Sequence, residues 1–113
     1  MAFGDGLKDK IIKLGGKGKI DSILKYIGNP SEDVRVAVAM ALGMIPTYDS
    51  GTALIPLFRD SSPMVRAAAA EAAADINAKH ITEYVKKLAF ADEDPNVQRA
   101  ARRSFEKLKD KVV

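Results

Sequence analysis

Apolar residues recur at helical spacing in three segments of the chain. Counted from Val34, Val65 and Val97, apolar or small residues stand at offsets of 0, 3, 4, 7, 8 and 11 residues. The three sets are Val34, Ala37, Val38, Ala41, Leu42 and Ile45; Val65, Ala68, Ala69, Ala72, Ala73 and Ile76; and Val97, Ala100, Ala101, Ser104, Phe105 and Leu108. At about 100° per residue these offsets fall on one side of a helix. The pattern predicts three amphipathic helices, each with one buried stripe.

The three segments also share a start signal and a period. The valines that begin the stripes are 31 and 32 residues apart. Three residues before each valine stand side chains that cap helix N-termini, Ser31, Ser62 and Asp94. Pro63 and Pro95 follow two of these caps, at the first helical position, where a missing N–H does no harm. A structural repeat of about this length is therefore predicted.

A second apolar block precedes each of these helices, over residues 20–27, 54–58 and 81–90, so each copy is predicted to be a helical hairpin. Pro56 lies inside the second block and should bend its helix. Residues 7–14 are amphipathic as well and are expected to form a capping helix. Since single hairpins cannot bury their stripes, they must stack. We therefore predict an all-α fold, a right-handed α-solenoid of about three hairpins.

We expect one domain over residues 1–113. It comprises an N-terminal capping helix and turn (1–18), a first repeat (19–45), a second repeat (46–76) and a third repeat with a C-terminal cap (77–113).

Residues Asp60, Pro63, Val65 and Arg66, followed by the alanines at 67–70, resemble a HEAT repeat, in the short form found in phycobilisome lyases. The resemblance covers about residues 19–113. It implies that the second helix of each hairpin lines a concave binding surface. It also implies that the arginine after each valine binds an aspartate in the turn. The pairs carried over are Asp60 with Arg66 and Asn29 with Arg35, and Gln98 should break the series in the third repeat.

Offsets 2, 5, 6 and 9 from each valine point away from the predicted core, so they mark the candidate binding surface. The residues assigned to a partner are Val36, Ala39, Met40, Ala67, Ala70, Glu71, Ala74, Arg99, Arg102 and Arg103, with Gly43 and Glu106 in the same register. One end is apolar and the other holds arginines, which grip carboxylates well. The predicted partner is another protein, bound through an apolar and acidic helix or tail.

A purely structural interpretation of the same residues stays open. Outward alanines also supply helix propensity and let neighbouring helices approach closely. The three arginines would equally suit a solvated helix end.

The composition gives little support for catalysis. The chain has no Cys and one histidine, His80, so a thiolate site is excluded and a metal site lacks ligands. The glycine-rich segment 15–19 lacks the spacing of a phosphate-binding loop and is interpreted as a turn. We predict no enzyme activity, no catalytic residues, no metal and no cofactor.

Two other functions remain as alternatives. Lysines at positions 8, 10, 13, 17 and 19, with the C-terminal arginines, could bind nucleic acid, but the middle of the chain supplies no basic stripe, so we do not expect this partner. An accessory role in an enzyme complex, lyase-like or chaperone-like, rests on the resemblance alone. No segment is apolar enough for a membrane span and no signal peptide is recognised. We therefore expect a cytoplasmic protein that is a monomer or a weak homodimer.

Overall fold

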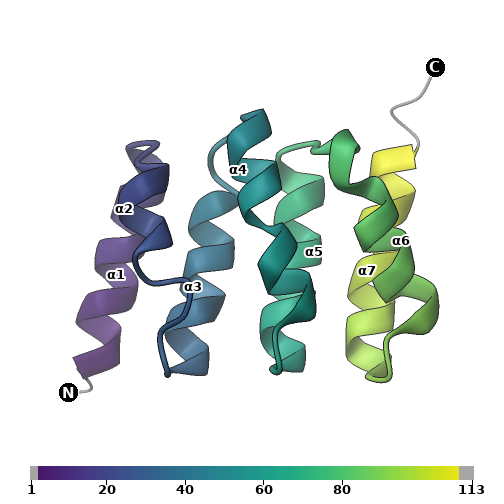
Figure 1. Cartoon of the computed structure of the whole chain (residues 1–113), viewed down its shortest axis with the longest axis horizontal. Helices are drawn as coiled ribbons and strands as arrows, with labels where there is room; N and C mark the ends of the chain where they lie inside the picture. The colour runs from purple at the N-terminus through teal and green to yellow at the C-terminus, as the bar shows by residue number, and fades with distance from the viewer. Residues whose placement is uncertain (1–2, 110–113) are drawn as a thin grey trace.

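The computed structural model describes residues 3–109, and within that range the regular elements are all helices. They are α1 (Phe3–Gly16), α2 (Ile20–Leu24), α3 (Glu32–Leu42), α4 (Tyr48–Ala53), the 3₁₀ helix η1 (Ile55–Arg59), α5 (Pro63–Asp75), the 3₁₀ helix η2 (Lys79–Ile81), α6 (Thr82–Ala91) and α7 (Pro95–Lys109). Figure 1 shows them in a row, with α1 and α7 at opposite ends of the molecule. The longest axis measures 43 Å. This elongated stack confirms the predicted all-α class.

The helices form two layers. Helices α1, α3, α5 and α7 pack side by side in that order and make one layer. Helices α2, α4 and α6, with η1 and η2, make the other layer, where each precedes its partner in the first layer (Figure 1). The arrangement is that of stacked helical hairpins with α1 added at the N-terminal end. The right-handed superhelix stays a prediction.

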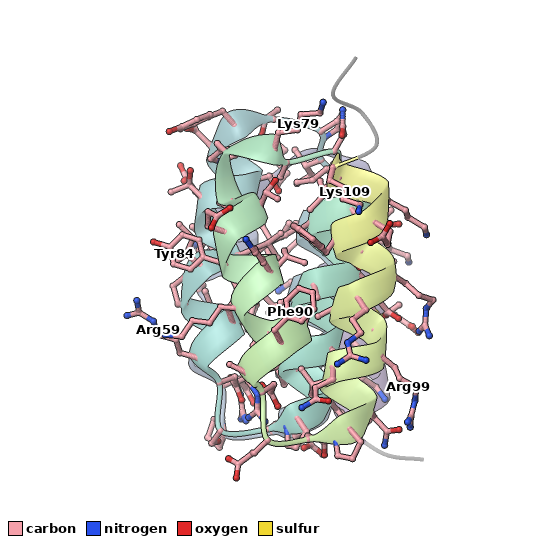
Figure 2. All side chains as sticks on the ribbon, turned by 90° about the vertical axis from the view of Figure 1, so that its right-hand side faces the viewer. Arg59, Lys79, Tyr84, Phe90, Arg99 and Lys109 are labelled. Carbon is pink, nitrogen blue, oxygen red and sulfur yellow. The ribbon has the colours of Figure 1, made fainter. Side chains whose placement is uncertain are left out.

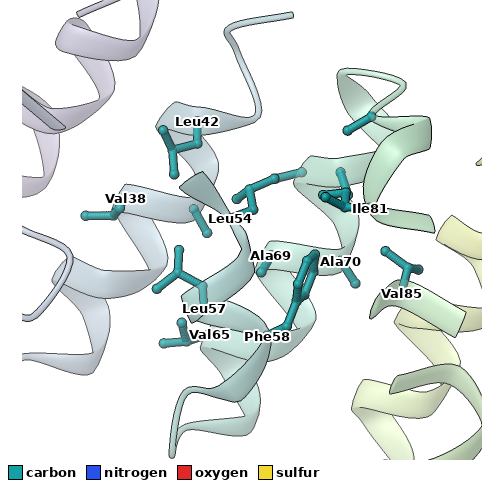
Figure 3. Packing of buried hydrophobic residues seen from close by; sticks show 14 of the residues in the cluster. Val38, Leu42, Leu54, Leu57, Phe58, Val65, Ala69, Ala70, Ile81 and Val85 are labelled. Atoms are coloured by element: carbon teal, nitrogen blue, oxygen red, sulfur yellow. The ribbon is translucent and has the colours of Figure 1, made fainter. Parts of the chain in front are cut away.

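The core lies between the two layers and contains the predicted stripes. Val34, Val65 and Val97 expose 2% of their surface or less, so all three face inward as expected. Leu57 and Phe58 of η1, Ala69 of α5 and Val85 of α6 belong to one buried cluster, part of which Figure 3 shows. Of the stripe positions, only Ala68, Ile76 and Phe105 are partly exposed. The phase predicted from the apolar spacing is therefore correct in all three copies.

The helix starts are also as predicted. The Ser31 and Ser62 hydroxyls accept hydrogen bonds from Val34 N (3.4 Å) and Val65 N (3.3 Å). Asp94 Oδ1 accepts from Val97 N at 3.1 Å. Pro56 follows the end of α4 and stands in the first turn of η1, so the first helix of this hairpin is broken into an α segment and a 3₁₀ segment. The helix is thus disrupted at this proline, through a change from α to 3₁₀ geometry where a bend was expected.

The arginines at the edge of the stack pair differently from the expectation. The Arg35 guanidinium binds the Asp60 carboxylate in a bidentate manner, at 2.9 and 3.0 Å, and Arg66 binds Asp92 at 2.8 and 3.1 Å. The expected partners contribute main-chain carbonyls: Asn29 O accepts from Arg35 and Asp60 O accepts from Arg66. Each arginine therefore joins its own turn to the turn of the following hairpin, because its fork has donors enough for both.

The arginine series ends at Gln98, as predicted. The Gln98 side chain donates to the carbonyl of Asp92, the contact that corresponds to Arg66 with Asp60. A neutral amide is sufficient here, because Gln98 binds a main-chain carbonyl and no carboxylate. The edge contacts of Arg35 and Arg66 are called the arginine ladder below.

The ladder fixes the charge of both aspartates. Burial raises the pKa of Asp60, but hydrogen bonds from Arg35 and from Ser62 N–H, with the charges of Arg35 and Arg66, outweigh burial and hold the pKa below its ordinary value. The pKa of Asp92 is lowered against the same penalty by Arg66 and Asp94 N–H. Both carboxylates are therefore ionised at neutral pH and are fully engaged.

Two glycines let the second helices approach closely. A Cβ atom built on Gly15 would lie 2.9 Å from the main chain of Ala41, and one on Gly43 would lie 2.9 Å from Ala72 Cβ. Gly15 therefore belongs to the α1–α3 contact and not to the turn, whereas Gly18, with φ +68°, does serve the turn. The glycine-rich segment 15–19 therefore both forms a turn and allows close helix packing.

Candidate protein-binding surface

The exposed side of α1, α3, α5 and α7 carries most of the residues predicted to face a partner. Met40, Glu71, Arg99 and Arg103 are exposed on this side. Val36, Ala67 and Ala74 are half-buried at the same surface. We call this side of the second-helix layer the outer surface.

Two of the predicted partner-binding residues are buried and so do not lie on the outer surface. Ala39 and Ala70 expose 0% of their area and belong to the core. Figure 3 shows Ala70 on the side of α5 that is turned toward α6. In a stacked array, each second helix is covered by neighbours over a wider arc than one apolar stripe indicates, so offset 5 is buried. Gly43, at offset 9, is half-buried, because it packs closely against Ala72 of α5 while remaining at the surface.

Arg102 stands at the offset that Ala39 and Ala70 occupy in the other copies. Its Nε donates to the carbonyl of Ala89 at 3.1 Å, and its guanidinium lies 5.7 Å from the centre of the Phe90 ring. Phe90 is otherwise exposed, at the end of the stack that faces the viewer in Figure 2. Arg102 therefore covers the end of α6, which supports the structural interpretation for this one arginine.

A groove runs over the outer surface where α1, α3 and α5 meet. Its volume is about 530 Å³. Its lining includes three methionines, Met40, Met44 and Met64, which expose 55%, 48% and 56% of their surface. Ile12, Val36, Ala67, Glu71 and Asp75 complete its principal walls. We call this feature the methionine groove, and it is largely apolar and open to solvent.

The sequence pattern missed several residues of this groove. Met44 and Asp75 stand at offset 10, one helical turn beyond the predicted Met40 and Glu71. Met64 directly precedes the valine at offset 0, and Ile12 belongs to α1, whose outward residues were not assigned. Extending the outward row by steps of four residues would have found Met44 and Asp75.

Charge changes sign across the outer surface. The apolar residues of α1 and α3 are followed on α5 by Glu71 and Asp75, and on α7 by Arg103 and Lys107. The Arg103 guanidinium lies 3.8 Å from the Glu71 carboxylate, and both side chains are more than half exposed. An acidic row on α5, formed by Glu71 and Asp75, thus separates the apolar part of the outer surface from the basic part.

His80 and the carboxylates were also considered as metal ligands, and the helices as membrane spans. His80 is exposed, stacks on Tyr48 with ring centres 4.0 Å apart, and lies 3.1 Å from the Thr52 hydroxyl. Within residues 3–109, no three His, Cys, Asp or Glu side chains converge as a metal site would require. None of the helices in the described part of the chain is long and apolar enough to cross a bilayer.

The basic residues do not form one continuous stripe. The N-terminal lysines belong to α1 and its turn, and the arginines belong to α7, at opposite ends of the stack (Figure 1). The acidic row of α5 lies between them on the outer surface. A nucleic acid following this surface would cross carboxylates, which opposes binding to phosphates.

Comparisons with known proteins bear on the family. No curated protein matches the chain significantly. The family described as HEAT repeats matches residues 51–113, which is more than half of the 113-residue chain. The short phycobilisome-lyase form of the repeat stays a prediction, because the match concerns HEAT repeats in general. The stacked hairpins, the inward valines and this match together show that the chain belongs to the HEAT repeat family.

Proposed function

We propose that the protein is a non-catalytic interaction module that binds another protein in the methionine groove. HEAT repeats generally mediate protein–protein interaction, and stacked repeats offer extended surfaces for it. The observation that carries the proposal is the concentration of exposed methionines: three of the chain's four Met residues line one groove. Methionine side chains are flexible and polarisable, so they adapt to apolar partners.

The shape of the groove favours a helix as the bound element. An amphipathic helix places apolar residues along one side, and such a stripe would cover Met40, Met44 and Met64. The acidic residues of α5 and the arginines of α7 would decide how the bound helix is oriented. Acidic residues of the partner would lie toward Arg99 and Arg103, while the flank over Glu71 and Asp75 would be neutral or basic. The partner helix is thus expected to be apolar along its centre and to carry acidic residues on one side only, the side that faces α7.

The test begins with capture of the partner. A photo-crosslinking residue at position 40 would be used in the native cell to identify the protein that contacts the groove. Binding of that purified protein would then be measured by calorimetry to the wild type, to Met40→Asp and to Phe90→Asp. Phe90 is a matched control, because it is also an exposed apolar residue but lies outside the groove.

We expect Met40→Asp to weaken binding by about tenfold or more, since a charge in the centre of an apolar contact removes a major contributor. Phe90→Asp should leave the affinity within about twofold. Equal affinity of all three proteins would contradict the proposal. Self-association that is lost in Met40→Asp would instead assign the groove to a second copy of the chain.

A further inference from the structure

A second groove lies on the opposite layer of the molecule, between η1 and α6. Its volume is about 360 Å³, which is enough for one or two side chains of a partner. Phe58 and Leu88 are buried in its floor, and Tyr84 forms part of its wall. The Phe58 and Tyr84 rings stack with an interplanar angle of 13° and centres 6.0 Å apart. The floor of the groove is therefore apolar and aromatic, and Tyr84 is its exposed member.

Two cations, Arg59 and Lys87, stand at the rim of this groove. Both are exposed, and within residues 3–109 neither has a salt bridge. Figure 2 shows Arg59 and Tyr84 projecting from the same edge of the molecule, across from Arg99 on α7.

The acidic residues of this groove do not cancel both cations. Asp92 also lines the groove, but its two carboxylate oxygens each accept a hydrogen bond from the Arg66 guanidinium. Glu83 is the remaining carboxylate of the lining. With Asp92 neutralised by Arg66, the two cations outnumber the available acid, and the groove is complementary to negative charge.

These residues are particular to one pair of hairpins. The positions one repeat earlier that correspond to Phe58, Arg59, Tyr84 and Lys87 are Ile27, Gly28, Thr52 and Ile55. Stacking of the hairpins therefore requires neither the aromatic pair nor the two cations at these positions. Phe58 and Tyr84 contact each other across the two hairpins, so the feature that points to a ligand is the pair of exposed cations beside them.

We propose that this groove binds a short acidic segment of a partner protein that carries a phenylalanine or a leucine. The apolar side chain occupies the floor formed by Phe58, Tyr84 and Leu88. A flanking carboxylate is held by the Arg59 fork, with Lys87 adding a second positive charge. The groove lies on the layer opposite the methionine groove, so the module would hold two partners at once. Neither site depends on the other.

The test uses a defined probe, the peptide acetyl-Glu-Glu-Phe-Asp-Leu-amide, titrated into ¹⁵N-labelled protein and followed by NMR. We expect saturable shifts at Tyr84, Lys87 and Leu88. A peptide with lysines in place of its acids, and one with glycines in place of Phe and Leu, should each bind at least about tenfold more weakly. Equal binding of either control peptide would overturn the proposal.

Variants locate the site. Arg59→Glu combined with Lys87→Glu should weaken peptide binding by about tenfold or more. Lys79→Glu combined with Lys86→Glu makes the same change in net charge at exposed positions outside the groove and should leave binding within about twofold. If the first variant does not fold by circular dichroism, the glutamine substitutions replace it. Equal binding by both variants, or shifts at these residues that follow protein concentration without peptide, would overturn the proposal.

Discussion

Helix α5 makes two ionic contacts that use the same chemical groups in different surroundings. Arg66 binds Asp92 through two hydrogen bonds and Asp60 through a third, with side chains only 12% and 6% exposed in the Arg66–Asp92 pair. Glu71, five residues later, meets Arg103 at 3.8 Å with both side chains in water. The comparison shows that burial and the number of hydrogen-bond partners decide whether an ion pair links two hairpins or remains a surface contact. The ladder joins neighbouring hairpins, whereas the charges of the outer surface stay in water, where the proposed partner would reach them.

The largest effect is expected on the inner side of α5. Ala69→Asp places a carboxylate at a position that is 0% exposed and belongs to the apolar core cluster. The cost of about 4 kcal/mol or more is comparable with the stability of a small domain, so the folded state should be lost. Circular dichroism and urea unfolding measure the loss of the folded state.

Met40→Asp changes an exposed residue of the outer surface and should keep the wild-type spectrum. An unfolded Met40→Asp protein would contradict the assignment of inner and outer sides.

The next effect concerns the ladder. Asp92→Asn leaves the Arg66 guanidinium nearly buried without its counter-charge, which should lower the free energy of unfolding by about 3 kcal/mol. Urea unfolding at neutral pH measures the change. A loss below about 0.5 kcal/mol would show that the ladder contributes no more than a surface pair.

The ladder also predicts how stability depends on pH. Because the folded-state pKa values of Asp60 and Asp92 lie below the ordinary value of 3.8, their contribution is complete above that value. It is lost as the pH falls from about 4 through the lower folded-state values. Thermal unfolding between pH 2 and 6 should show this loss in the wild type. The Asp60→Asn, Asp92→Asn double variant should show a shallower acid dependence, and an unchanged slope would exclude the ladder as its source.

The smallest effect is expected for Glu71→Gln. This change removes the outer pair with Arg103 but leaves every ladder contact in place. The free energy of unfolding should change by less than about 0.5 kcal/mol, because exposed pairs are weak. The same urea experiment applies, and a loss as large as that of Asp92→Asn would remove the distinction between the two kinds of contact.

The sequence predicted local features well because they depend on nearby residues. The inward valines, the caps Ser31, Ser62 and Asp94, and the break near Pro56 all follow from spacing and backbone chemistry within one hairpin. The structure confirms each of them.

Contacts between hairpins were predicted less well. The partner of Arg35 is Asp60, 25 residues away, and not the neighbouring Asn29 side chain, since the stacking geometry selects the carboxylate of the next turn. Ala39 and Ala70 are buried because adjacent hairpins cover a second side of each helix. The methionine groove combines α1, α3 and α5, so only the assembled layer brings its residues together.

The central claim is that the partner protein occupies the methionine groove. The methionine methyl groups offer the most direct measurement, because Met40, Met44 and Met64 line the groove and Met1 is the one other methionine. In a ¹³C-methyl NMR titration of the wild-type protein with the crosslinked partner, the three groove resonances should shift together and saturate with the same affinity as calorimetry gives. If that partner binds while all three resonances stay unchanged, the groove is not its binding site.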